Sequence, residues 1–298
     1  MSPRALRIAT RKSELARWQA NEVGRALGVT YELVLVETHG DVDLVSSLAE
    51  IGGQGVFVKE VQAAVMRNEA DIAVHSAKDL PATSLSELVI AGFLPRGDIR
   101  DAMVGSRFND LPRGAKVATG SARRKALLLW YRPDLNVVGL RGNIRTRLAQ
   151  LGGVDAMVIA NAALIRLGLG ASATEVFEPE FFCPQVSQGA IAIEARADDA
   201  NAIEVIGRID DGPTRAQVTA ERSMLEMLGS GCSLPVGAYS TALSNGNALF
   251  GMIASSDGKE LVSASMSGVD PVGLGTEMGR YLLSAGGERL LAREVGRP

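Results

Sequence analysis

The stretch that decides the fold reads DIAVHSAKD over residues 71–79. Its opening apolar run predicts a short buried β-strand that ends at His75 and Ser76. A basic and an acidic side chain, Lys78 and Asp79, follow the strand directly. In sheets whose strands run mainly parallel, ligands bind in the loops beyond the carboxyl ends of the strands. The stretch therefore predicts one strand of such a sheet, with a functional position at its end.

Comparable apolar runs recur up to about residue 195, and stretches with helical spacing separate them. We expect further strands at residues 6–9, 33–36, 89–93, 116–118, 135–140 and 156–160. The clearest helix covers residues 14–27, where Ser13 is a suitable N-cap and apolar residues recur at steps of three and four. Short strands that alternate with helices predict an α/β fold with mainly parallel sheets.

The pattern changes after about Gly212, where a C-terminal α+β module is expected to begin. A predicted helix over residues 216–228 leads into a glycine-rich loop around Cys232. Antiparallel strands are expected at residues 239–242, 249–255 and 261–267, with Asp257-Gly258 as a hairpin signal. Two helices, near residues 271–284 and 287–295, are expected to close the chain.

The composition excludes several classes of protein. Of the 298 residues, 46% are hydrophobic and 22% are charged, which is typical of a globular chain of about two domains. Two cysteines cannot form a disulfide framework, and two histidines offer little for a His/Cys metal site. The N-terminus lacks a signal-peptide core, and no apolar run reaches the ~18 residues of a membrane span. We expect a cytoplasmic protein without a metal.

The net charge of −3 conceals a basic segment. Residues 96–147 hold ten arginines and two lysines against four aspartates, a local charge of +8. Such a cluster in an otherwise acidic chain indicates an anionic partner. Nucleic acid is not favoured, because only 4% of the residues are aromatic and no binding motif is present. Small carboxylate or phosphate ligands suit the arginine fork better.

The strand ends collect polar side chains. Thr119-Gly120-Ser121 follows one predicted strand and opens a helix, where free backbone N–H groups and the helix dipole would attract an anion. Arginines lie at or near these strand ends, namely Arg11, Arg123, Arg124, Arg141, Arg145 and Arg147. They would add charge-assisted hydrogen bonds to the same ligand. The alternative is that each arginine belongs to a solvated helix face.

Asp79 and Cys232 are the two candidates for covalent or acid–base chemistry. Asp79 is an acid among basic strand ends, so it could transfer protons or stabilise a cation. Its alternative role is to cap the turn before Pro81. Cys232 lies between glycines and serines, which suits a reactive or modified thiol, although a loop cysteine can also be structural. Cys183 follows two phenylalanines and is expected to be buried.

Several stretches together resemble one known family. They read RIATRKS at 7–13, WQA at 18–20, GGQGVFVKE at 52–60, DIAVHSAKDLP at 71–81, RDA at 100–102, LRGN at 140–143, TRL at 146–148 and TAER at 219–222, before Gly231-Cys232. In this order they resemble the hydroxymethylbilane synthases, also called porphobilinogen deaminases. The resemblance extends over residues 6–291, nearly the whole chain.

The resemblance implies a transferase of porphyrin and haem biosynthesis. Such enzymes join four porphobilinogen molecules head to tail and release ammonia each time. A dipyrromethane cofactor primes the chain, and the resemblance places its thioether on Cys232. Asp79 matches the catalytic carboxylate, which would assist loss of the amine and stabilise the azafulvene-like cation. A monomer that binds neither nucleic acid nor membranes is implied.

The resemblance also assigns the residues that bind ligands. The cofactor would be held, besides Cys232, by Lys78, Thr119, Ser121, Arg123, Arg124 and Arg141. The substrate would be held by Arg11, Ser13, Gln19, Arg147 and Arg166. The basic segment agrees with this assignment, because every pyrrole brings two carboxylates.

The family's fold has three domains, of which the first two resemble periplasmic binding proteins. Here these would be residues 1–95 with 189–211, residues 96–188, and residues 212–298 with the cofactor cysteine. Residues 52–55 resemble the family's mobile lid. The chain departs from the usual pattern at His39 for Arg, Gln54 for Lys, Gly120 for Ser and Ser187 for Gly.

Two other functions compete with this interpretation. A binding module of the periplasmic type would share the architecture, but it would leave Asp79 and Cys232 without a role. An enzyme acting on phosphate esters could use the anion site at Thr119, but the sequence has no Walker-type loop and no metal-binding carboxylate cluster.

Overall fold

The computed structural model describes residues 4–37, 58–229 and 234–295. The chain divides into two compact units. The first comprises Met1–Gly97 and Gly189–Arg215, and the second comprises Asp98–Gln188 and Ala216–Pro298. Cys232, His39, Gln54 and the predicted lid at residues 52–55 lie outside the described residues.

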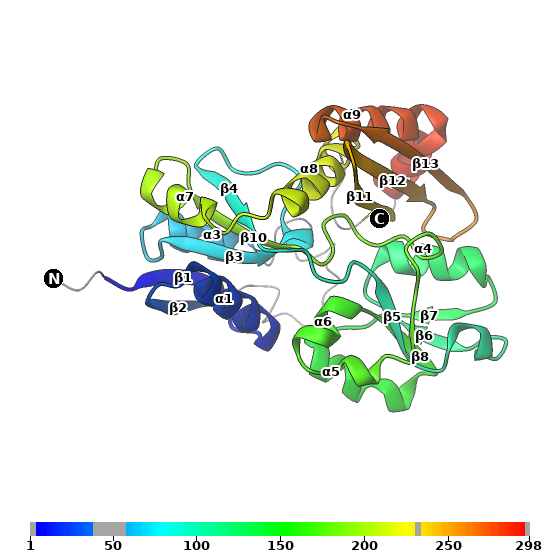
Figure 1. Ribbon diagram of the computed structural model, residues 1–298. Helices are drawn as coiled ribbons and strands as arrows, with labels where there is room; N and C mark the ends of the chain where they lie inside the picture. The colour runs from blue at the N-terminus through cyan, green and yellow to red at the C-terminus, as the bar shows by residue number, and fades with distance from the viewer. Residues whose placement is uncertain (1–3, 38–57, 230–233, 296–298) are drawn as a thin grey trace. The chain divides into compact units, whose positions relative to one another are not determined.

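The first unit is built on a five-stranded sheet with the order β2-β1-β3-β10-β4 (Figure 1). Its strands are β1 (Leu6–Arg11), β2 (Tyr31–Val36), β3 (Ile72–Ser76), β4 (Leu88–Phe93) and β10 (Ile191–Arg196). Its helices are α1 (Glu14–Leu27), α3 (Lys59–Met66) and α7 (Ala200–Gly207). Strand β1 is parallel to β2 and β3, whereas β10 is antiparallel to both of its neighbours. Four strands therefore point the same way.

The second unit repeats this pattern in a sheet with the order β7-β6-β8-β5-β9. Its strands are β5 (Asp101–Gly105), β6 (Lys116–Ala118), β7 (Asn136–Val138), β8 (Ala156–Ala160) and β9 (Glu175–Val176). Its helices are α4 (Ala122–Tyr131), α5 (Ile144–Ala149) and α6 (Asn161–Arg166). Here β5 is the antiparallel strand between β8 and β9. Each sheet thus contains one reversed strand.

The second unit also contains an antiparallel three-stranded sheet. It consists of β11 (Val236–Leu243), β12 (Gly246–Ala254) and β13 (Leu261–Gly268). Helices α9 (Pro271–Leu282) and α10 (Glu288–Val295) follow, and α8 (Gly212–Met227) precedes the sheet. The predicted fold class, α/β with mainly parallel sheets and a C-terminal α+β portion, is confirmed.

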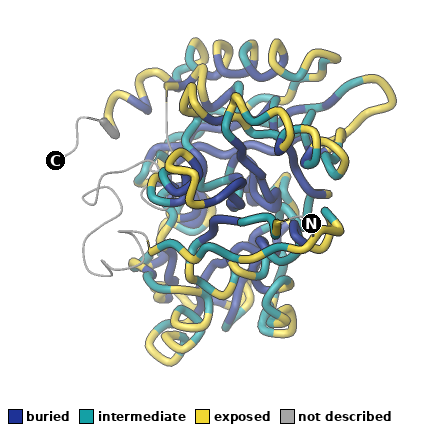
Figure 2. The backbone as a smooth tube through the Cα atoms, turned by 90° about the vertical axis from the view of Figure 1, so that its left-hand side faces the viewer, coloured by how far each residue is buried: buried dark blue, intermediate teal, exposed yellow. Residues whose placement is uncertain are grey.

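Local sequence explains the elements that flank the site. Ser13 caps α1 by accepting a hydrogen bond from the Ala16 N–H, as predicted, and Gly28 ends the helix in the left-handed conformation. Along the helices the buried and exposed segments alternate (Figure 2), as expected for amphipathic helices that pack one face inward.

The reversed strands β5 and β10 were not predicted, and neither was β9. Strand β10 reads IAIEAR, and its Ala and Glu residues favour helices in isolation. It becomes a strand because it pairs on both sides, with β3 and with β4. Tertiary pairing therefore overrides local propensity here.

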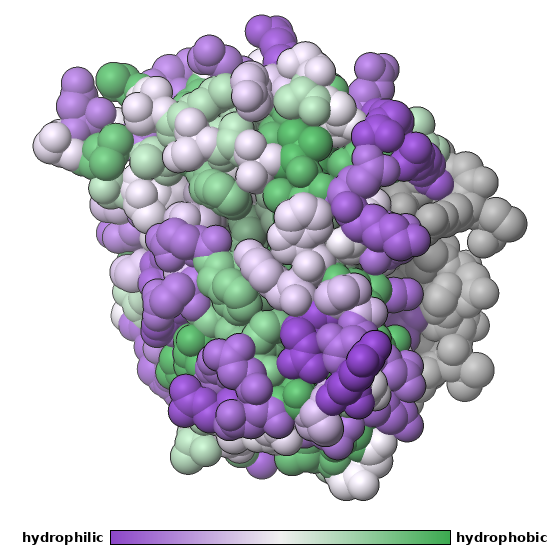
Figure 3. Space-filling model, turned by 90° about the vertical axis from the view of Figure 1, so that its right-hand side faces the viewer, coloured by the Kyte–Doolittle hydropathy of each residue, from purple (hydrophilic) through white to green (hydrophobic). Residues whose placement is uncertain are grey.

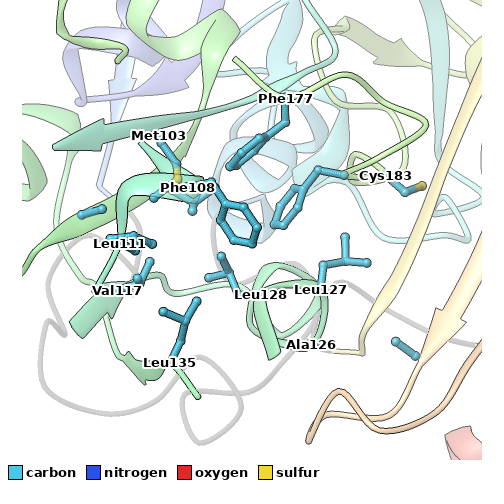
Figure 4. Close-up of a cluster of buried hydrophobic side chains, with 14 of the residues drawn as sticks. Met103, Phe108, Leu111, Val117, Ala126, Leu127, Leu128, Leu135, Phe177 and Cys183 are labelled. Carbon is cyan, nitrogen blue, oxygen red and sulfur yellow. The ribbon is translucent and has the colours of Figure 1, made fainter. Parts of the chain in front are cut away.

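The main core of the second unit lies between its five-stranded sheet and α4. Phe108 and Phe177 meet edge to face, with ring centroids 5.9 Å apart. Figure 4 shows these rings gathered with Leu127 and Leu128 of α4 in one apolar cluster. Residues of β11 and β12 join the same cluster, so the C-terminal sheet and the five-stranded sheet share a core.

The surface is mixed in character. Hydrophilic and hydrophobic residues alternate over short distances on the face drawn in Figure 3. Among the helices of the described residues, none has the length and apolar character needed to cross a bilayer.

Candidate active site

Asp79 lies in a short 3₁₀ turn, Ala77–Asp79, that follows β3 directly. The Ala77 N–H donates to the Ala190 carbonyl at 3.0 Å, which ties the turn to the start of β10. Ala77 and Leu80 are buried, whereas the side chains of Lys78 and Asp79 remain partly exposed. Buried residues therefore anchor the turn at both ends, and its two charged side chains reach the surface.

Three buried polar residues support the end of β3. The Gln62 Nε2 atom donates to both carboxylate oxygens of Glu194, at 3.1 and 3.0 Å. His75 Nε2 lies 3.0 Å from Glu194 Oε2, close enough for an ion pair when the imidazole is protonated, but not aligned for a hydrogen bond. These residues belong to α3, β10 and β3, so they link three elements beneath the turn.

Gln19 and Ser13 lie at the neighbouring strand end. The buried Gln19 amide and the Ser76 hydroxyl exchange two hydrogen bonds, at 2.8 and 3.1 Å. Ser13 is engaged as the cap of α1. Because β1 and β3 are parallel neighbours, Arg11 at the end of β1 shares one sheet edge with Lys78 and Asp79. The structure thus brings these five predicted site residues together within the first unit.

Thr119 and Ser121 lie at the start of α4 in the second unit. The Thr119 hydroxyl accepts a hydrogen bond from the Ser121 N–H at 3.3 Å, and the Ser121 hydroxyl accepts one from the Arg124 N–H at 3.4 Å. The sequence suggested that the N–H groups here would be free for an anion. Two of them are instead capped by the hydroxyls that were expected to accompany the ligand.

Arg123 and Arg124 are buried and share one carboxylate, that of Asp101. Their side chains are 2% and 6% exposed, and Asp101 is fully buried. Arg123 Nη2 donates to Asp101 Oδ2 at 2.6 Å, and Arg124 Nη2 donates to Oδ1 at 2.7 Å. Neither arginine belongs to a solvated helix face, so that alternative is wrong for this pair.

Burial affects both signs of charge in this cluster, because it lowers the pKa of the Arg123 guanidinium while the charge of Asp101 opposes that effect. Burial alone would raise the pKa of Asp101, but the charges of Arg123 and Arg124 outweigh burial and hold that pKa well below its usual range. Asp101 therefore stays ionised at neutral pH. Two guanidinium groups against one carboxylate leave a positive charge in excess at this point of the interior.

The other predicted cations of the second unit are more accessible. Arg141, Arg147 and Arg166 are all partly exposed. Arg147 Nε donates to the Gly142 carbonyl at 2.7 Å, and Gly142 itself adopts a φ of +94° that favours glycine. Burial lowers the pKa of Arg166 to about 10, which leaves its guanidinium protonated at neutral pH. These residues follow the parallel strands β7 and β8 on the same sheet.

Of the two cysteines, only Cys183 lies among the described residues. Cys183 is buried, as predicted, and burial raises the pKa of its thiol well above the usual range. Cys232 lies outside the described residues, so its role stays a prediction. Within the described part of the chain, no group of three or more His, Cys, Asp or Glu side chains is arranged to hold a metal ion.

Sequence reasoning missed Asp101, Gln188 and Glu194 as parts of the site. Asp101 stands in the RDA motif and is one of four aspartates in the basic segment, which was the available signal. Glu194 and Gln188 gave no local signal, because their partners lie far away in the sequence.

Ser187 adopts a left-handed backbone conformation, with φ +62°. It stands where glycine is usual in the family that the sequence resembles, and its buried hydroxyl has no hydrogen-bond partner among the described residues. We expect Ser187→Gly to stabilise the protein by about 1 kcal/mol, because glycine adopts this conformation without steric strain. A rise in melting temperature of about 2–4 °C would be measured by calorimetry.

The control is Ser187→Ala, which removes the hydroxyl but keeps the Cβ atom. The Ser187 N–H donates to Glu221 at 2.7 Å, and both variants retain this bond. A glycine variant no more stable than the alanine variant would show that backbone strain is not the cause.

Comparisons with known proteins identify the family of this chain. One family model, described as "Porphobilinogen deaminase, dipyromethane cofactor binding domain", matches residues 6–204, and the "Porphobilinogen deaminase, C-terminal domain" matches residues 215–284. A porphobilinogen deaminase of Trichlorobacter lovleyi is 42% identical, over 98% of this chain and 97% of its own. One of Francisella tularensis subsp. holarctica is 41% identical, over 95% and 98%. The chain belongs to the porphobilinogen deaminase family.

Likeness to solved structures is more distant. YhfZ from Shigella flexneri is 17% identical, with a TM-score of 0.37 over 78% of this chain and all of its own. Protein PG110 from Staphylococcus aureus is 11% identical, with a TM-score of 0.41 over 70% of this chain and 88% of its own.

Proposed function

We propose that this chain catalyses the reaction of its family, the head-to-tail condensation of four porphobilinogen molecules into hydroxymethylbilane with release of ammonia. The observation that carries the proposal is family membership over nearly the full chain, including the cofactor-binding domain over residues 6–204. When bound, a dipyrromethane cofactor supplies the pyrrole to which the first substrate is joined. We propose Cys232 as its thioether anchor.

Asp79 is the proposed catalytic carboxylate. Loss of ammonia breaks a C–N bond, needs a proton on the leaving amine and leaves positive charge on the substrate. A carboxyl group at this turn can donate that proton to the amine, and the carboxylate that remains can then stabilise the cation. Asp79 suits both tasks, because its side chain is partly exposed and makes no hydrogen bond or ion pair among the described residues.

The cationic residues are proposed to divide the carboxylates of cofactor and substrate between them. The buried pair Arg123 and Arg124 carries an excess positive charge, and the Nε atom of each is buried without a hydrogen-bond partner in the described part of the chain. Such unsatisfied donors fit an anionic group, so these residues suit the cofactor. We also assign Lys78 of the first unit, and Arg141, Thr119 and Ser121 of the second, to the cofactor on the basis of the family resemblance.

The partly exposed residues suit an exchanging substrate. We propose that Arg11, Arg147 and Arg166 bind its acetate and propionate groups, with Ser13 and Gln19 beside Arg11. These partly exposed side chains can release and rebind carboxylates as the chain grows, which the buried pair cannot do without breaking its contacts with Asp101.

The organisation of the molecule is part of the proposal. We propose three domains, residues 1–95 with 189–211, 96–188 and 212–298. The first is supported by the compact unit Met1–Gly97 with Gly189–Arg215, whereas the other two lie together in the second compact unit. We also propose a cytoplasmic monomer that binds neither nucleic acid nor membranes.

Intact-mass measurement of the purified protein tests the function. We expect the mass of the chain to be raised by two pyrrole units, and the protein to convert porphobilinogen into a linear tetrapyrrole with release of ammonia. A protein that carries no added mass, and gains none on incubation with porphobilinogen, would contradict the proposal.

A further inference from the structure

We infer that Asp101 is a positioning residue, which holds Arg123 and Arg124 where they meet the carboxylates of the cofactor. The inference rests on the proposed function. Asp101 lies on β5, and each of its oxygens accepts a hydrogen bond from one arginine. The Gln188 Nε2 atom donates to Asp101 Oδ1 and to the Ile99 carbonyl, both at 2.8 Å, and so adds a third hydrogen bond that fixes the carboxylate.

Each guanidinium is also held at a second nitrogen. Arg124 Nη1 donates to the Val158 carbonyl at 3.1 Å, and Arg123 Nη1 donates to the Cys183 carbonyl. Two contacts on a planar group define its position and its plane, so little conformational freedom remains to be lost when a ligand binds. The Nε atoms are the donors left without partners among the described residues.

Stability alone does not account for this arrangement. A buried ion pair is often no more stabilising than apolar side chains of the same volume, because both charges must be desolvated. Here three charged side chains are buried, and their charges do not cancel. A bound anion would balance the excess positive charge of this network. Asp101 would then fix the orientation in which the two guanidinium groups meet that anion.

The C-terminal sheet approaches Arg123 closely at Gly237. Gly237 of β11 lies so close that a Cβ atom there would be 2.9 Å from Cys183 Sγ, 2.9 Å from the Pro184 carbonyl oxygen and 3.1 Å from Arg123 Cδ. A side chain at this position would force Cys183 and Pro184 to shift and would crowd Arg123, whose Nη1 donates to the Cys183 carbonyl, without altering any charge. Gly237 therefore offers a steric test of the same inference.

The first test is Asp101→Asn, with Asp98→Asn as its control. Asparagine keeps the shape of Asp101 but replaces one carboxylate oxygen by an NH₂ group. Because this group cannot accept a hydrogen bond from a guanidinium group, one of the two arginines loses its partner. We expect cofactor loading, followed by intact mass during incubation with porphobilinogen, to slow about tenfold or more at a temperature where the variant is folded. Asp98 pairs with Arg100 and Asn161 instead, so its variant should load like the wild type.

The second test is Gly237→Ala, with Gly251→Ala as its control. A Cβ atom at Gly251 of β12 would be 2.6 Å from Met224 Sδ, among the apolar side chains of α8 and α9. Both variants are expected to lower the melting temperature, because both glycines are buried in the same small sheet. Only Gly237→Ala should also slow cofactor loading in the folded state.

The outcomes separate positioning from a general structural role. Wild-type loading rates in folded Asp101→Asn would overturn the inference, as would loading that falls only in step with stability in all four variants. If Asp101→Asn does not fold, the two glycine variants decide. A wild-type protein that never gains the mass of the cofactor would overturn the proposed function instead.

Discussion

Replacing Asp79 by Asn is expected to lower the rate of ammonia release at least about a hundredfold, while porphobilinogen still binds. Asparagine keeps the size of the side chain but removes the negative charge and the site that holds a proton. General acid–base assistance is typically worth about 10²–10⁴-fold, and stabilisation of a developing cation adds to it. The measurement is single-turnover ammonia release by protein already loaded with cofactor.

Two further variants make the Asp79 test specific. Asp79→Glu keeps the charge but displaces it, so we expect it to retain measurably more activity than Asp79→Asn. Asp110→Asn removes an exposed carboxylate from a short 3₁₀ turn of the second unit and should leave turnover unchanged. Thermal melting checks that each variant is folded. Near wild-type release from folded Asp79→Asn would leave Asp79 as a turn residue and move the chemistry elsewhere.

Cys232→Ser should abolish the covalent cofactor completely. A serine hydroxyl is a far weaker nucleophile than a thiolate, so no stable link to dipyrromethane is expected. Without an anchored primer, tetrapyrrole formation should fall to the background level. Intact mass and product formation, measured on the same preparation, check both expectations.

Cys183→Ser is the matched control for the cofactor link. Cys183 is buried and burial raises the pKa of its thiol, so it cannot readily supply a thiolate. This variant should keep the added mass, although a hydroxyl in an apolar site will lower stability. Cofactor that survives in Cys232→Ser, or disappears only in Cys183→Ser, would contradict the assignment of the anchor.

Local patterns in the sequence were sufficient to predict most of the fold. Strands at residues 116–118 and 156–160 agree with β6 and β8 to the residue, and the helix at 14–27 with its Ser13 cap agrees with α1. These elements depend on neighbours within a few positions, namely apolar spacing and a capping hydroxyl. The turn that carries Asp79 was predictable for the same reason, since it directly follows a strongly apolar strand.

The environment of the arginines depended on tertiary structure. From the sequence, Arg123 and Arg124 could be solvated or could bind a ligand, and their internal partner was not apparent. Asp101 lies 22 and 23 positions away from them, and the Cys183 carbonyl lies 60 positions from Arg123. Burial and ion pairing are set by which strands become neighbours, and the reversed strand β5 is what brings Asp101 to α4. Sequence spacing therefore identified the charged residues, whereas only the folded chain decided which of them pair with each other.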